Sequence, residues 1–201
     1  MVASAESNVR LLESMGFSNI VVGLKSSDVL ETIEAYRLFS KKWDYPLHLG
    51  LTEAGFGVRG AIKSAVALGI LLEEGIGDTI RVSLTDDPVR EVEAAYDILR
   101  ALRLRQHGPE IISCPTCGRC SVDLQRIVRE VERGLGGVTK PIKVAVMGCE
   151  VNGPGEAKQA DVGLAFSKSW GFIFKRGKIQ MRVEPQEAVD ALLEYIYCED
   201  L

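Results

Sequence analysis

Cysteines are the residues whose type and spacing most directly indicate chemistry in this chain of 201 residues. Cys114, Cys117 and Cys120 lie three residues apart in the segment CPTCGRC, and Cys149 lies in a later glycine-rich segment. In a reducing compartment, cysteines are more often metal ligands or reactive thiols than disulfides. The total of five cysteines is odd, which argues against a fully paired set of disulfides.

Three kinds of site fit this cysteine pattern. A structural zinc site could use all four of these thiols, although Cys149 lacks the closely spaced second cysteine that such sites usually have. A thioredoxin-like dithiol at Cys114 and Cys117 would not need Cys149. An iron–sulfur cluster would take Cys114, Cys117 and Cys149 as its thiolate ligands.

The glycine-rich segment 148–156 favours the iron–sulfur interpretation. Its glycines allow backbone N–H groups to approach cluster sulfurs, and such hydrogen bonds tune the reduction potential. Glu156 ends the segment and is a candidate fourth ligand, because a carboxylate binds iron less softly than a thiolate and could yield to a substrate oxygen. We expect Cys120 to begin the next helix as a free thiol, and we assign no role to Cys198.

The elements that must position these residues alternate regularly up to residue 108. Strands are expected at 19–24, 46–51 and 80–84, each apolar on both faces and each followed by a helical pattern. Such units, about thirty residues apart, predict a parallel sheet covered by helices.

The helices of this first part carry recognisable start signals. Asp28 is expected to cap one helix, and Asp87 to cap another that has Pro88 at its first position. The apolar residues of that second helix are expected to form a buried stripe made of Val89, Val92, Tyr96 and Leu99.

A domain boundary is expected near residue 108, where the pattern changes. Beyond it we expect strands at 110–113, 142–147, 161–166, 171–175 and 178–183. We also expect a helix defined by apolar residues from Leu124 to Val131 that ends near Gly134, and a closing helix that begins at Pro185. Cys114 and Cys149 each follow one of these strands directly.

Polar residues also follow the strands of the first part, where parallel α/β proteins place their chemistry. Lys25 follows the first strand, His48 and Glu53 belong to the second, and Arg81 and Ser83 lie on the third. Each alone could be a solvated or a core residue. Together, Lys25, Arg81 and Ser83 suit a phosphate or diphosphate, while Glu53 and His48 suit proton transfer or hydroxyl binding.

The bulk composition excludes other classes. The formal net charge is −4, which does not indicate nucleic-acid binding, and no apolar run approaches the roughly 20 residues that span a bilayer. The first residues lack the features of a secretory signal, so we expect a cytoplasmic protein.

Several segments together resemble the 4-hydroxy-3-methylbut-2-enyl diphosphate synthase family. They are PLHLGLTEAG, GAIKSA, GIGDTIRVSL with the following DDP, CPTCGR and GCEVNGPGEA, in this order over nearly the whole chain. The resemblance implies a two-electron reductive ring opening and dehydroxylation of 2-C-methyl-D-erythritol 2,4-cyclodiphosphate by a [4Fe–4S] enzyme of non-mevalonate isoprenoid biosynthesis. It also implies a homodimer, and flavodoxin or ferredoxin as the electron donor.

The resemblance assigns roles to individual positions. Cys114, Cys117 and Cys149 match the thiolate ligands, and Glu156 matches the carboxylate ligand. Asn152 matches an asparagine near the reacting hydroxyl. Lys25, Arg81 and Ser83 match diphosphate-binding positions. Glu53 and His48 match barrel positions that face the substrate.

The resemblance further implies an α/β fold, with the C-terminal part of a TIM barrel at 1–108 and a smaller α+β iron–sulfur domain at 109–201. A barrel needs eight βα units and about 250 residues, whereas only three units precede the second domain. We therefore expect an incomplete copy whose open sheet exposes apolar surface, and which alone is poorly soluble or inactive.

The alternative functions are a zinc-stabilised interaction module and a simple iron–sulfur electron carrier. The segment 166–170 departs from the family pattern.

Overall fold

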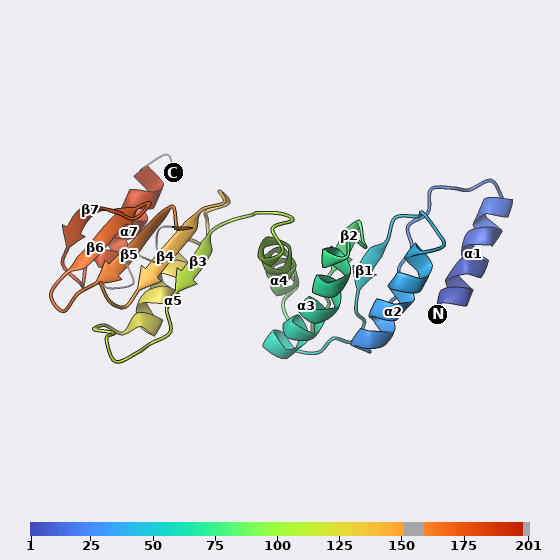
Figure 1. Ribbon diagram of the computed structural model, residues 1–201, viewed down its shortest axis with the longest axis horizontal. Helices are drawn as coiled ribbons and strands as arrows, with labels where there is room; N and C mark the ends of the chain where they lie inside the picture. Colours follow the sequence, from blue (N-terminus) through green and yellow to red (C-terminus); the bar gives the residue numbers. More distant parts are fainter. Residues whose placement is uncertain (151–158, 199–201) are drawn as a thin grey trace. The chain divides into compact units, whose positions relative to one another are not determined.

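A computed structural model describes residues 1–150 and 159–198. The chain divides into two compact units, Met1–Gln106 and His107–Leu201, each with its own hydrophobic core. Both are of mixed α/β type (Figure 1). None of the described helices is long and apolar enough to cross a lipid bilayer.

The first unit alternates helices with short parallel strands. β1 and β2 pair in parallel, and Val22 forms a parallel bridge to Leu47. The strand expected at 19–24 is thus reduced to this one bridge. The pairing does not continue past Val22, because the Leu24 N–H donates to the hydroxyl of Tyr36. The elements of this unit are α1 (Val2–Ser14), α2 (Val29–Ser40), β1 (His48–Gly50), α3 (Gly57–Glu73), β2 (Thr79–Arg81) and α4 (Pro88–Ala101).

The predicted helix caps are confirmed. The Asp28 carboxylate accepts a hydrogen bond of 2.8 Å from the Glu31 N–H at the start of α2. Asp87 accepts one of 2.9 Å from the Val89 N–H, and Pro88 opens α4. Each cap satisfies a backbone donor that a helix start leaves unpaired.

The predicted buried stripe of α4 is wrong at two of its positions. Val89 and Val92 are 61% and 55% exposed, and Ile98 is the buried residue of this helix. On α3, Ile62 and Val66 are exposed as well, whereas the core takes Leu68 and Leu71. Apolar periodicity predicts a helix correctly, but it does not show which apolar positions have a packing partner.

The second unit is built on one mixed sheet in the order β3-β4-β5-β6-β7. β3, β4 and β5 are parallel neighbours, while β5, β6 and β7 pair antiparallel. Helices α5 and α7 pack against the sheet and against each other (Figure 1). The elements are β3 (Glu110–Ser113), α5 (Leu124–Gly134), β4 (Lys143–Met147), β5 (Val162–Phe166), β6 (Gly171–Lys175), β7 (Lys178–Val183) and α7 (Ala188–Cys198).

Two predicted helix starts in this unit are wrong. Cys120 does not begin a helix, because α5 begins at Leu124, where Asp123 accepts a hydrogen bond of 3.1 Å from the Arg126 N–H. The closing helix α7 begins at Ala188 rather than at Pro185. In the first case the capping carboxylate sets the start of the helix.

The core of the first unit generates a stability prediction. Phe39 on α2 is fully buried, whereas Leu30 on the same helix is 74% exposed. We expect Phe39→Ala to lower the free energy of unfolding of this unit by about 3–5 kcal/mol, because it leaves a cavity. Urea unfolding followed by circular dichroism measures the change. Leu30→Ala is the control, and equal effects of the two substitutions would contradict this assignment of the core.

Candidate functional site

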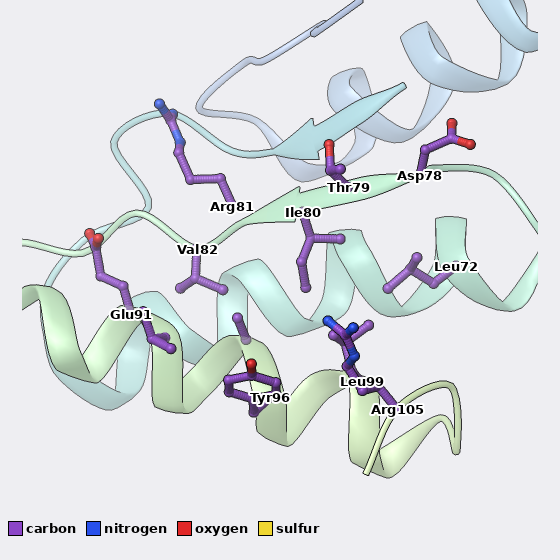
Figure 2. A pocket seen from close by; sticks show the side chains of 12 residues that line it. Leu72, Asp78, Thr79, Ile80, Arg81, Val82, Glu91, Tyr96, Leu99 and Arg105 are labelled. Carbon is purple, nitrogen blue, oxygen red and sulfur yellow. The ribbon is translucent and has the colours of Figure 1, made fainter. Parts of the chain in front are cut away.

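Polar side chains collect on one face of the β1–β2 pair. In the parallel register, His48 lies opposite Thr79 and Gly50 lies opposite Arg81. A hydrogen bond of 2.8 Å joins His48 Nδ1 and Thr79 Oγ1. Figure 2 shows Thr79 and Arg81 pointing to the side of β2 opposite to Ile80. Alternation along the strands therefore separates a polar face from an apolar face.

Lys25 reaches the same polar face across Gly50. A Cβ atom at position 50 would lie 2.9 Å from the Arg81 carbonyl oxygen and 3.2 Å from Lys25 Cε. Glycine thus makes room for both residues, and Arg81 Nη2 donates a hydrogen bond of 3.1 Å to the Leu51 carbonyl. The structure brings Lys25, His48 and Arg81 together, three of the five polar residues singled out from the sequence.

The basic residues of this face lower the pKa of Lys25 and of His48. Burial and the neighbouring Arg81 charge lower the pKa of Lys25. Burial lowers the pKa of His48, and the charges of Lys25 and Arg81 lower it further. Two permanent or near-permanent cations beside a neutral imidazole form a site that favours an anion.

Tyr36 on α2 supports this arrangement from beneath and was missed in the sequence. Its hydroxyl accepts from the Leu24 N–H at 2.9 Å and donates to the His48 carbonyl at 2.6 Å. Burial raises its pKa to about 12, so it stays a neutral donor. Tyr36 thus ties the segment before Lys25 to β1. No local sequence signal distinguishes it from an ordinary core tyrosine.

The loops after the strands are joined at the same end. The Thr52 N–H donates to the Ser26 carbonyl at 3.1 Å, and the Thr85 N–H donates to the Gly55 carbonyl at 3.0 Å. Glu53, in the loop after β1, is exposed and has a left-handed backbone with φ of 53°. Ser83 lies half-buried two residues beyond β2. Both therefore lie at the strand end that carries the cations, but the structure gives no contact that assigns them a role.

A pocket of about 470 Å³ lies on the other side of β2 (Figure 2). Ile80 of β2 and Val82 just after it line the pocket together with Val92, Tyr96 and Leu99 of α4. Arg81 contributes to its wall, but the guanidinium points to the opposite side (Figure 2). The pocket is mainly apolar and separate from the cationic face.

The cysteines follow neighbouring strands of the second unit. β3 and β4 pair in parallel, so Cys114 and Cys149 emerge at the same edge of the sheet. The Gly148 N–H donates to Cys114 Sγ at 3.5 Å, and Cys149 is only 6% exposed. Cys117 is exposed, and hydrogen bonds from Arg119 lower its pKa, which favours the thiolate.

Cys120 lies closer to this site than its expected position at a helix start implied. A Cβ atom on Gly148 would lie 2.4 Å from Cys120 Sγ, so a larger residue there would displace the Cys120 thiol. In the range 1–150 and 159–198, no group of three His, Cys, Asp or Glu side chains is arranged to hold a metal ion. Asn152 and Glu156 lie outside the described residues. Thiolate is nevertheless the donor type that iron–sulfur clusters require.

In the part of the chain that the structure describes, a cationic cluster and a thiol-rich cluster lie at the carboxyl ends of parallel strands in an α/β protein. Residues 1–96 match the family model described as the GcpE TIM-barrel domain, and residues 110–197 match the GcpE protein C-terminal domain. The chain belongs to the GcpE family. The resemblance drawn from its motifs is thereby confirmed.

Relatives in bacteria carry one common name, 4-hydroxy-3-methylbut-2-en-1-yl diphosphate synthase (flavodoxin). That of Thermodesulfovibrio yellowstonii is 57% identical over 98% of this chain and 56% of its own length. That of Nitratidesulfovibrio vulgaris is 59% identical over 92% of this chain and 48% of its own length. The chain therefore spans about half the length of the curated relatives it matches.

The cationic face generates a titration prediction. We expect His48 to titrate below its usual value of 6.5, and Arg81→Gln to raise the midpoint because one repelling charge is removed. Because the folded-state pKa of His48 is lower than the unfolded-state pKa, protonation of His48 opposes folding. The stability of the fold is therefore fully retained above about pH 6.5 and is lost as the pH falls. NMR titration of the imidazole signals measures this, with His48→Gln to assign them. An unchanged midpoint in Arg81→Gln would contradict the coupling.

Proposed function

We propose that this chain supplies diphosphate-binding and cluster-binding parts of a 4-hydroxy-3-methylbut-2-enyl diphosphate synthase. The observation that carries the proposal is the placement of Cys114 and Cys149 at the ends of adjacent parallel strands. The relatives' common name supports the same reaction class. The reaction takes two electrons, opens the cyclic diphosphate of 2-C-methyl-D-erythritol 2,4-cyclodiphosphate and removes one hydroxyl oxygen.

The cationic face would bind the diphosphate. Lys25 and Arg81 approach each other across Gly50, so an anion between them would relieve their mutual repulsion. Arg81 offers a planar fork of donors that suits phosphate oxygens, and Ser83 would add a hydroxyl donor. His48 and Glu53 would orient a substrate hydroxyl or move its proton.

The thiol-rich site would hold a [4Fe–4S] cluster through Cys114, Cys117 and Cys149, with Glu156 on the fourth iron. A cluster bound there would supply electrons and a Lewis-acidic iron. The Gly148 N–H is already directed at Cys114 Sγ, and the low exposure of Cys149 keeps water away from this part of the site. Asn152 would contact the reacting hydroxyl.

At the level of the whole protein, residues 1–108 would form part of a TIM barrel and residues 109–201 the cluster domain. The proposed assembly is a cytoplasmic homodimer in which one subunit's cluster domain closes over the other's barrel, with flavodoxin or ferredoxin as electron donor. Turnover is proposed for the complete barrel. The exposed apolar residues Val89 and Val92 of α4 provide surface that further barrel units could cover.

Anaerobic purification tests the cluster. We expect iron and sulfide in a ratio near one, with an EPR signal after reduction. Cys149→Ser should lose most of the iron, whereas Cys198→Ser, at the exposed end of α7, should retain it. Cys120→Ser decides whether that thiol is a ligand. Zinc without iron would refute the proposal and support a zinc-stabilised module.

Inorganic pyrophosphate tests the diphosphate site separately. We expect it to bind to the chain and to raise the pKa of His48, because the bound anion offsets the charges of Lys25 and Arg81. Lys25→Gln should weaken binding about tenfold, the loss expected for one charged contact. Lys63→Gln on α3 is the control. NMR titration measures both, and equal binding by Lys25→Gln would contradict the assignment.

A further inference from the structure

Positive charge is concentrated in one part of an acidic chain. Residues 162–183 contain five Lys or Arg and no Asp or Glu, although the whole chain has a formal net charge of −4. These residues are β5, β6, β7 and their connections (Figure 1). The five cations are Lys168, Lys175, Arg176, Lys178 and Arg182. The net charge of the whole chain therefore hides a locally basic segment.

Aromatic side chains lie beside basic residues where β6 begins and β7 ends. The Arg182 guanidinium lies 5.3 Å from the ring centre of Trp170 and 5.6 Å from that of Phe172. Phe172 and Arg182 are paired on β6 and β7, and Trp170 remains 36% exposed. Lys168 is exposed in the same turn as Trp170. Arginine and tryptophan in one exposed cluster are the residues enriched at protein interfaces.

This cluster lies on the face of the sheet away from α5 and α7. Ile173, the next residue after Phe172, is fully buried in the core that these helices cover. Because side chains alternate along a strand, Phe172 and its partner Arg182 point to the opposite face. The helices therefore leave the cluster of Lys168, Trp170, Phe172 and Arg182 uncovered.

The same cluster adjoins the thiol-rich site. Ser121 Oγ donates to the Ser167 carbonyl at 3.1 Å, and the Ser121 N–H donates to the Gly148 carbonyl at 3.1 Å. Gly148 in turn contacts Cys114 through its N–H and directly precedes Cys149. Ser121 thus joins the turn that carries Lys168 and Trp170 to Gly148, which lies beside Cys114 and directly before Cys149.

We propose that Lys168, Trp170, Phe172 and Arg182 form the docking surface for an acidic electron-donor protein that reduces the cluster. This inference rests on the proposed function, because only a redox site needs such a partner. Complementary charge would steer the encounter, and the exposed aromatic surface would hold the partner beside the thiols. Opposite charges at the rim, rather than a large apolar area, suit a complex that must dissociate after each electron transfer.

Binding to purified oxidised flavodoxin tests the surface. We expect the chain to bind flavodoxin at 20 mM NaCl and to lose about tenfold in affinity at 200 mM, because salt screens exposed charges. Lys168→Glu with Arg182→Glu should weaken binding at least about tenfold at low salt. Trp170→Ala should weaken it without changing the charge. Arg129→Glu on α5, an exposed residue on the helix-covered side, is the matched charge control.

Isothermal titration calorimetry measures these affinities, and circular dichroism shows whether each variant is folded. Equal binding by the double variant and the native chain, or equal losses in Arg129→Glu, would overturn the proposal. No binding by the native chain, or tighter binding of a DNA duplex to the same residues, would also overturn it. If the double variant does not fold, Lys168→Glu alone decides, since Lys168 is exposed in a turn.

Iron and sulfide analysis of the same samples separates this inference from the proposed function. Native chain that contains iron, but binds flavodoxin no better than the double variant does, would refute the docking surface alone. Chain that contains no iron would refute the proposed function. In stopped-flow experiments, reduction by flavodoxin should slow in the double variant, while reduction by dithionite should not, because the small reductant does not use the surface.

Discussion

Parallel pairing of neighbouring strands is the constraint on which both candidate sites depend. In a parallel pair the carboxyl ends lie at one edge, so residues far apart in the sequence become neighbours. In the first unit this pairing brings His48 level with Thr79 and places Lys25 beside Arg81. In the second it directs the Gly148 N–H at Cys114 Sγ, although 34 residues separate them. Glycine at position 50 leaves room for Lys25 beside Arg81, and glycine at position 148 leaves room for the Cys120 thiol.

The cationic face opposes the stability of the fold that carries it. Lys25 and Arg81 repel each other, and both oppose a charge on His48; together with the partial burial of Lys25 and His48, this lowers the pKa of these two residues. Tyr36 offsets part of this cost by bonding to the segment before Lys25 and to the backbone of His48. A site that is electrostatically unfavourable when empty is suited to an anion, because binding relieves the repulsion.

The second unit combines this strand-end arrangement with an uneven charge distribution. Its sheet carries the thiols at the end of β3 and β4 and the basic, aromatic residues at the start of β6. Ser121 links the two regions through backbone carbonyls on both sides. The turn at 167–170 is therefore a structural neighbour of Gly148, the residue before Cys149. Such proximity suits a site that exchanges electrons with a protein partner.

Much of the secondary structure, and the family, could be predicted from local sequence signals. Apolar periodicity located the helices and most strands, and Asp28 and Asp87 marked helix starts because a capping carboxylate acts on a donor two or three residues away. The prediction failed where a residue's state depends on distant partners. Val89 and Val92 have the spacing of a buried stripe, yet they are 61% and 55% exposed.

The sequence by itself determined which chemical groups are available, namely cysteines at fixed spacing and polar residues directly after strands. Only the tertiary structure decided which of these groups meet. In the structure, Lys25, His48 and Arg81 lie together, Tyr36 hydrogen-bonds to the backbone of His48, and Cys120 lies against Gly148. The physical reason is that types and spacings are local properties of the chain, whereas contacts depend on strand order, register and the room that glycine leaves between strands.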